Sequence, residues 1–67
     1  GRKRYKADFI KFLVYAQASC DEATNQLTAL DVLYEDLYNW NSLIEEYNIL
    51  GKRINTFITY VYRSWKS

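Results

Sequence analysis

The sequence predicts an all-α fold in which two long helices form an antiparallel hairpin. The 67 residues include no proline and only two glycines, Gly1 and Gly51, so few residues interrupt a helix. Apolar residues recur at alternating steps of three and four in both halves of the chain, which is the spacing of one helical face. Charged residues are also segregated along the chain, and an antiparallel hairpin would gather the cations at one end.

The first helix is predicted over residues 4–33. Its periodic apolar and small residues are Phe9, Phe12, Leu13, Ala16, Ser19, Cys20, Ala23, Leu27, Leu30 and Leu33. Ala16, Ala18, Ser19, Cys20 and Ala23 make the middle of this helix narrow. An antiparallel partner would place Gly51 at that level, where the two backbones could approach closely.

The second helix is predicted over residues 37–64. Its periodic residues are Trp40, Leu43, Ile44, Tyr47, Leu50, Ile54, Phe57, Ile58, Val61 and Trp65. Asp36 is the expected N-cap, because its carboxylate could accept from free amides of the first turn. Ser42 with Glu45 is an alternative capping box that would start the helix later. The turn therefore falls near residues 33–36, and a bend within one continuous helix is the alternative.

Both helices are apolar on more than one face. Phe9, Leu13, Tyr47, Ile54 and Val61 are expected to carry the packing of the seam. Other large apolar residues fall outside it: Ile10, Val14 and Tyr15 in the first helix, and Tyr38, Ile49, Tyr60 and Tyr62 in the second. Leaving them in water would forfeit several kcal/mol at about 25 cal/mol per Å². We therefore expect more helices to cover them, from the same chain or from other copies.

The charges divide the chain into three segments. All nine cations lie in residues 1–20 and 51–67. They are Arg2, Lys3, Arg4, Lys6, Lys11, Lys52, Arg53, Arg63 and Lys66. Residues 21–46 hold seven acids and no cation: Asp21, Glu22, Asp31, Glu35, Asp36, Glu45 and Glu46. The first helix places its cations at the positive end of its dipole, which does not favour helix stability, so a binding role is one explanation of the pattern.

The chain is expected to be one domain, residues 1–67, stabilised by packing alone. Its single cysteine, Cys20, cannot close an internal disulfide, and there is no histidine to join it at a metal. We interpret Cys20 as a small apolar filler of the seam rather than a reactive nucleophile.

The location and extent of the chain are also expectations. No apolar run approaches the roughly 18 residues that span a bilayer, so no membrane association is expected. A lone thiol without a secretion signal favours the cytoplasm. The start at Gly1-Arg2, with no methionine in the chain, suggests a fragment. A residue left by a removed tag, or an amino-terminal segment outside the printed sequence, would explain the same start.

Several stretches resemble the four-helix-bundle proteins encoded in 23S rRNA intervening sequences. Residues 1–3, 8–13 and 16–23 resemble the third helix of that family, and residues 43–47 and 50–58 resemble the fourth. Two departures are alanine at Ala18, where the family usually has glycine, and a turn at 33–36 without glycine. The resemblance implies that the hairpin is the carboxy-terminal half of an up-and-down four-helix bundle, commonly assembled as a ring of five copies. A related fold, the accessory protein of diversity-generating retroelements, binds a reverse transcriptase and nucleic acid.

Catalysis is the least supported function. The chain has no histidine, no glycine-rich phosphate loop and no zinc-type spacing, so we expect no enzyme and no cofactor. Glu22 and Glu46 could belong to a carboxylate metal site, but the Glu-x-x-His motif of such bundles is missing. Ordinary solvated charge explains them better.

Two binding functions remain. The nine cations predict a sequence-tolerant surface for the RNA or DNA backbone. The alternative is an oligomeric scaffold, or an adaptor for a protein such as a reverse transcriptase, in which acidic ends pair with the basic ends of neighbouring copies. The seven tyrosines and two tryptophans could stack on bases, although helical spacing places most of them in a core or a subunit interface.

Overall fold

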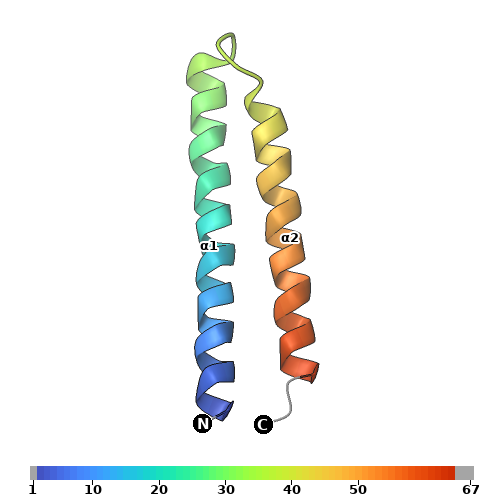
Figure 1. The fold of residues 1–67 in the computed structure, drawn as a ribbon. Helices are drawn as coiled ribbons and strands as arrows, with labels where there is room; N and C mark the ends of the chain where they lie inside the picture. The colour runs from blue at the N-terminus through green and yellow to red at the C-terminus, as the bar shows by residue number, and fades with distance from the viewer. Residues whose placement is uncertain (1, 65–67) are drawn as a thin grey trace.

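The computed structural model is a hairpin of two antiparallel α-helices (Figure 1). It describes residues 2–64, and the side chains of residues 4–64. Helix α1 spans Arg2–Tyr34 and helix α2 spans Trp40–Ser64, with residues 35–39 between them. The predicted all-α hairpin is confirmed. The chain breaks between the helices instead of bending within one continuous helix, and α2 begins three residues later than predicted.

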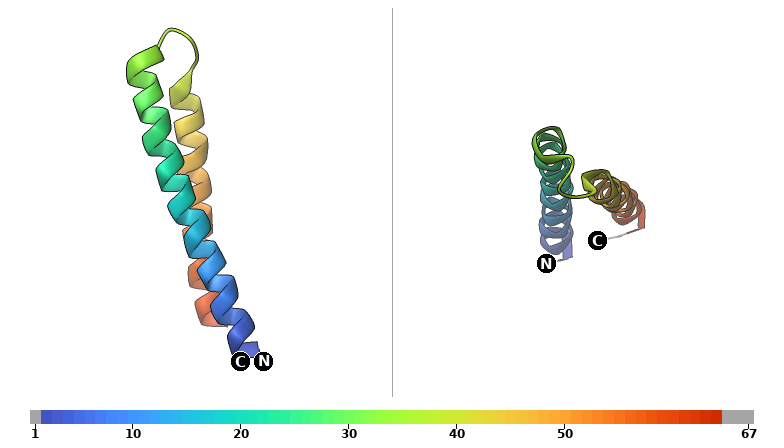
Figure 2. Two further views of the ribbon diagram at one scale, coloured as in Figure 1. Left: turned by 90° about the vertical axis from the view of Figure 1, so that its left-hand side faces the viewer. Right: turned by 90° about the horizontal axis from the view of Figure 1, so that it is seen from above.

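The hairpin is a rod. Its principal extents are 51 × 15 × 10 Å, and its radius of gyration is 15.6 Å, whereas a compact chain of this length would have about 11 Å. The helices stay side by side in the two further views, and the start of α1 lies at the same end of the rod as the end of α2 (Figure 2). Neither helix contains, within the described residues, an apolar stretch that could cross a membrane.

The core is small and lies towards the free ends of the helices. Ile10 and Leu13 of α1 pack with Ile58 and Val61 of α2, and Phe9 and Ile54 are half-buried against this cluster. Cys20 is buried at the middle of the rod, as predicted. The seam is therefore centred on one row of α1 residues that ends well before the tip.

Several seam assignments are wrong. Phe12 and Leu33 were placed on the seam but are 65% and 70% exposed, whereas Ile10 was placed off it and is buried. Each residue turns a helix by about 100°, so Phe12 faces well to one side of Leu13. Tyr47, expected to carry packing, is also exposed, at the edge of a polar groove beside Gln17. Trp65 lies outside the described residues.

The middle of the rod is a close helix crossing, as the small residues predicted. A Cβ atom built on Gly51 would lie 3.9 Å from the Cβ of Cys20. This is an ordinary van der Waals distance, and Gly51 does not have a positive φ. The site therefore has room for one methyl group but for little more.

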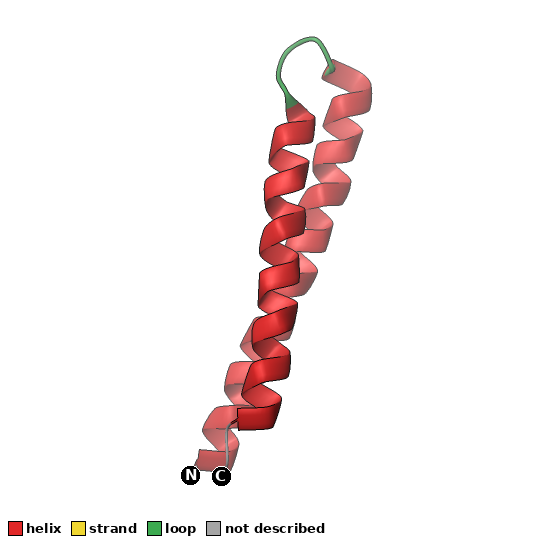
Figure 3. Cartoon of the chain, turned by 90° about the vertical axis from the view of Figure 1, so that its right-hand side faces the viewer, coloured by secondary structure: helices red, strands yellow, loops and turns green. Residues whose placement is uncertain are grey.

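The turn is held by hydrogen bonds around Tyr34 and Asn39 (Figure 3). The Tyr34 carbonyl accepts from the amide of Leu37 at 3.0 Å and from the indole Nε1–H of Trp40 at 2.9 Å. The Oδ1 atom of Asn39 accepts from the amide of Ser42 at 3.3 Å, which is the geometry of an N-cap. The N-cap is thus Asn39, and neither Asp36 nor the Ser42–Glu45 box starts α2, because the loop runs three residues further.

We expect Asn39→Ala to lower the free energy of unfolding by about 1 kcal/mol, because it leaves an amide of the first turn without its acceptor. For a chain of this size, that corresponds to a fall of about 4–8 °C in the thermal midpoint, measured by circular dichroism. Asp36→Ala is the matched control and should stay within about 0.5 kcal/mol. An equal loss for both variants would contradict the assignment of the cap.

Gly51→Ala should stabilise the hairpin by up to about 1 kcal/mol, because alanine favours a helix over glycine and its methyl group meets Cys20 without a clash. Urea unfolding of the purified chain measures this gain. Gly51→Leu is the control with a larger side chain, and it should destabilise the hairpin by forcing the helices apart. Destabilisation by alanine would show that the helices cross more closely than 3.9 Å allows.

Candidate basic end and aromatic face

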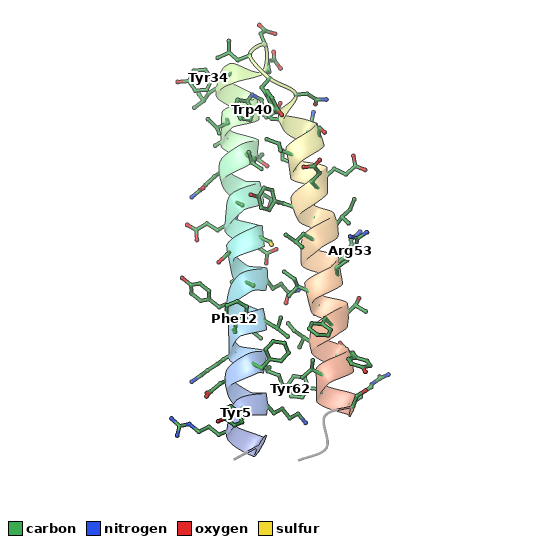
Figure 4. All side chains as sticks on the ribbon, in the orientation of Figure 1. Tyr5, Phe12, Tyr34, Trp40, Arg53 and Tyr62 are labelled. Carbon is green, nitrogen blue, oxygen red and sulfur yellow. The ribbon has the colours of Figure 1, made fainter. Side chains whose placement is uncertain are left out.

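Four of the predicted cations gather where the free ends of the helices meet. Arg4, Lys6 and Lys11 lie in the first three turns of α1, and Arg63 lies in the last turn of α2. Lys6 connects the two helices, because its Nζ donates to the backbone carbonyl of Tyr62 at 3.4 Å and lies 6.0 Å from the centroid of the Tyr62 ring. We call these four residues the terminal cations. Figure 4 shows Tyr5 and Tyr62 at the same end.

The terminal cations differ in their surroundings. Arg4, Lys11 and Arg63 are exposed, whereas Lys6 is half-buried against α2. The Nε of Arg4 lies 3.9 Å from Oδ2 of Asp8, one turn later, and both side chains are mostly exposed. Because such a surface pair is weak, Asp8 does not stop Arg4 from meeting an anionic partner.

Lys52 and Arg53 do not belong to this end. They follow Gly51, which faces Cys20 at the middle of the rod, and Figure 4 shows Arg53 pointing away from α1. The eleven residues from Lys52 to Arg63 correspond to about 17 Å of helix, which exceeds the roughly 8 Å screening length at physiological salt. The expected single basic pole is therefore two separate groups.

Three further predicted cations cannot be placed as side chains. Arg2 and Lys3 belong to α1, but their side chains lie outside the described part of the molecule, as does all of Lys66.

The middle of the rod carries both signs of charge. Lys52 and Asp21 line one polar groove together with Gln17, Tyr47, Asn48, Gly51 and Asn55. Glu22 and Glu46 are exposed. Within the described residues, no three histidine, cysteine or acidic side chains gather in a way that could hold a metal ion.

An aromatic face flanks the seam on one side of the rod. Phe9 and Phe57 meet edge to face across the seam, with ring centroids 5.9 Å apart, and Tyr60 stacks on Phe57 at 6.2 Å. Tyr5 and Phe12 lie four residues before and three residues after Phe9, so they extend its row along α1. We call these five residues the aromatic face. Phe12, Tyr5 and Tyr60 each expose more than 60% of their surface.

Sequence reasoning missed this face as a unit. Phe9, Phe12 and Phe57 were assigned to the seam, and Tyr60 was placed outside it. The available signal was the step from Phe12 to Leu13, since two adjacent large apolar residues cannot both point at one neighbouring helix. The structure shows that Leu13 faces α2 and Phe12 faces solvent.

Comparisons of the chain with protein-family models, with curated proteins and with solved structures give no match. The resemblance to the intervening-sequence proteins stays a prediction, and function has to be argued from the surfaces described above.

Proposed function

We propose that this chain is a non-enzymatic assembly module whose aromatic face packs against the aromatic face of a second copy, so that two hairpins form one four-helix bundle. The observation that supports this proposal is the surface area of the isolated hairpin. It exposes 5571 Å². A compact monomer of 8.0 kDa would expose about 4,450 Å². The excess of about 1,100 Å² is surface that a folded protein normally covers.

The aromatic face is large enough to account for a stable contact. An aromatic side chain presents about 150–250 Å², and four of these five are between 44% and 68% exposed. Five such residues offer on the order of 500 Å² per copy. Two copies therefore reach the roughly 1,000 Å² that a specific interface needs.

A second copy is the favoured occupant because one patch can serve both partners of a two-fold dimer. Both helices contribute to the face, Tyr5, Phe9 and Phe12 from α1 and Phe57 and Tyr60 from α2. A two-fold axis through the face would thus bring four helices around one core. Other helices of a longer chain could cover the same face, and the concentration dependence of the mass separates the two cases.

We expect the purified chain to sediment with twice the 8.0 kDa mass of one copy, in an association that persists at high salt because the contact is apolar. Phe12→Asp should weaken this dimer at least about 30-fold, as the loss of a central aromatic anchor does. Sedimentation equilibrium measures both results.

Tyr15→Asp is the matched control for this experiment. Tyr15 is also exposed, at 75%, but it is turned about 120° from Phe9 around α1. Its substitution should leave the dimer intact. A chain that stays monomeric and fully helical at millimolar concentration would refute pairing through this face.

Nucleic-acid binding is a second candidate function, supported by the terminal cations and the aromatic rings beside them. Tyr5 and Tyr62 are 68% and 61% exposed at the same end as Arg4, Lys6, Lys11 and Arg63. Cations on the backbone and aromatic rings on the bases are how proteins bind single strands without sequence preference. A protein-binding adaptor would instead keep its partner at high salt.

The affinity for a single-stranded RNA should fall linearly with salt on logarithmic axes, with a slope that reports the number of phosphate contacts. Lys11→Glu with Arg63→Glu should flatten this slope by about 2, because each lost contact removes about 0.9. Lys52→Glu with Arg53→Glu is the control from the middle of the rod and should change it less. Fluorescence anisotropy across a salt series measures the slopes, and an absence of binding at low salt would end this candidate.

A further inference from the structure

The two ends of the rod carry surfaces of opposite character, each combining exposed apolar residues with one sign of charge. At the free ends of the helices, a groove is lined by Lys6, Ala7, Ile10, Lys11, Val14 and Tyr62. We call it the lysine-edged groove. Its apolar part comes from Ile10, Val14 and the Tyr62 ring, and two lysines belong to its rim.

The lysine-edged groove is distinct from the aromatic face. One step from Phe9 to Ile10 turns α1 by about 100°, so Ile10 and Val14 lie on the other side of the seam from Phe12. The contact of Lys6 with Tyr62 closes the groove on the α2 side. A partner could therefore occupy the groove while the aromatic face is already covered.

The opposite end of the rod is an apolar tip with acidic residues. Val32, Leu33 and Leu37 are 76%, 70% and 74% exposed, and we call residues 31–37 the acidic tip. Asp31, Glu35 and Asp36 supply its charge. The turn hydrogen bonds at Tyr34 hold these residues in a compact knob.

We propose that copies of this chain associate head to tail, with the acidic tip of one copy seated in the lysine-edged groove of the next. The tip cannot reach the groove of its own chain, because the rod is 51 Å long and the two surfaces lie at its opposite ends. The contact is therefore intermolecular. Because the two surfaces differ, each copy keeps a free tip and a free groove, and the assembly grows into a ring or a filament.

A second copy fits the groove better than a nucleic acid does. The apolar residues of the groove would remain wet against a phosphate backbone, whereas Val32, Leu33 and Leu37 could cover them. Residues 21–46 contain no cation, so the tip offers the lysines only attraction. This inference does not rest on the aromatic dimer, since it uses other residues and a charged contact that salt weakens.

The experiment measures the longest dimension of the particle by small-angle X-ray scattering at low and high salt, with Phe12→Asp present to suppress pairing through the aromatic face. Head-to-tail association should extend the particle well beyond 51 Å at low salt and lose this extension at high salt. A side-by-side dimer would keep roughly the length of one rod, so the two modes of assembly are told apart.

Charge reversal then tests the two surfaces directly. Lys6→Glu with Lys11→Glu, and separately Glu35→Lys with Asp36→Lys, should each weaken the elongation about tenfold or more, because each places like charges in contact. A chain carrying all four substitutions should elongate again, since its tip and groove are once more of opposite sign. Lys52→Glu with Arg53→Glu is the control with equal charge change and should elongate as before.

Leu37→Ser provides an independent variant, because Leu37 lies in the exposed loop and its change should not unfold either helix. It should shorten the particle without altering the net charge, and circular dichroism confirms that each variant stays helical. A rod that never elongates, an elongation that survives either charge reversal, or a four-fold variant that fails to recover would each overturn the proposal.

Discussion

Two helices share only one seam, and most features of this protein follow from that constraint. The seam buries Ile10, Leu13, Cys20, Ile58 and Val61, and each of its two walls is a single helix. Every other large apolar residue must lie at the edge of the seam or in water. A third or fourth helix is the usual solution for such a chain, since helices that are apolar on several faces are found inside bundles. The surplus of exposed surface is therefore a consequence of topology rather than of poor packing.

The register between the helices decides how the charges are arranged in space. The contact of Lys6 with Tyr62 fixes one end, the approach of Gly51 to Cys20 fixes the middle, and the bond from Trp40 to Tyr34 fixes the tip. Along this axis the charge changes from basic at the free ends, through mixed at the middle, to acidic at the tip. Because screening acts over about 8 Å, these regions behave as separate surfaces along a 51 Å rod.

The two proposed modes of self-association use different forces on different sides of the rod. The aromatic face is apolar, so its pairing should tolerate salt, whereas the acidic tip and the lysine-edged groove depend on charges that salt screens. A lateral dimer would leave both ends of each rod accessible, so the two contacts could combine into a larger assembly. Nucleic acid would compete with the head-to-tail contact for Lys6 and Lys11 and would leave the aromatic face untouched.

The amino-acid sequence by itself determined the helices, their antiparallel pairing, the buried place of Cys20 and the level of Gly51, because these follow from local propensity and from a periodicity of three and four. It could not assign Phe12 and Ile10 to their correct sides, since adjacent apolar residues both fit that periodicity. It also placed the cap at Asp36 instead of Asn39, because several residues of the loop can cap a helix. Only the tertiary structure decided the helix register, which separates Lys52 and Arg53 from the terminal cations and gathers the aromatic face. Such distances between helices depend on how side chains interlock across the seam, which no spacing along one helix records.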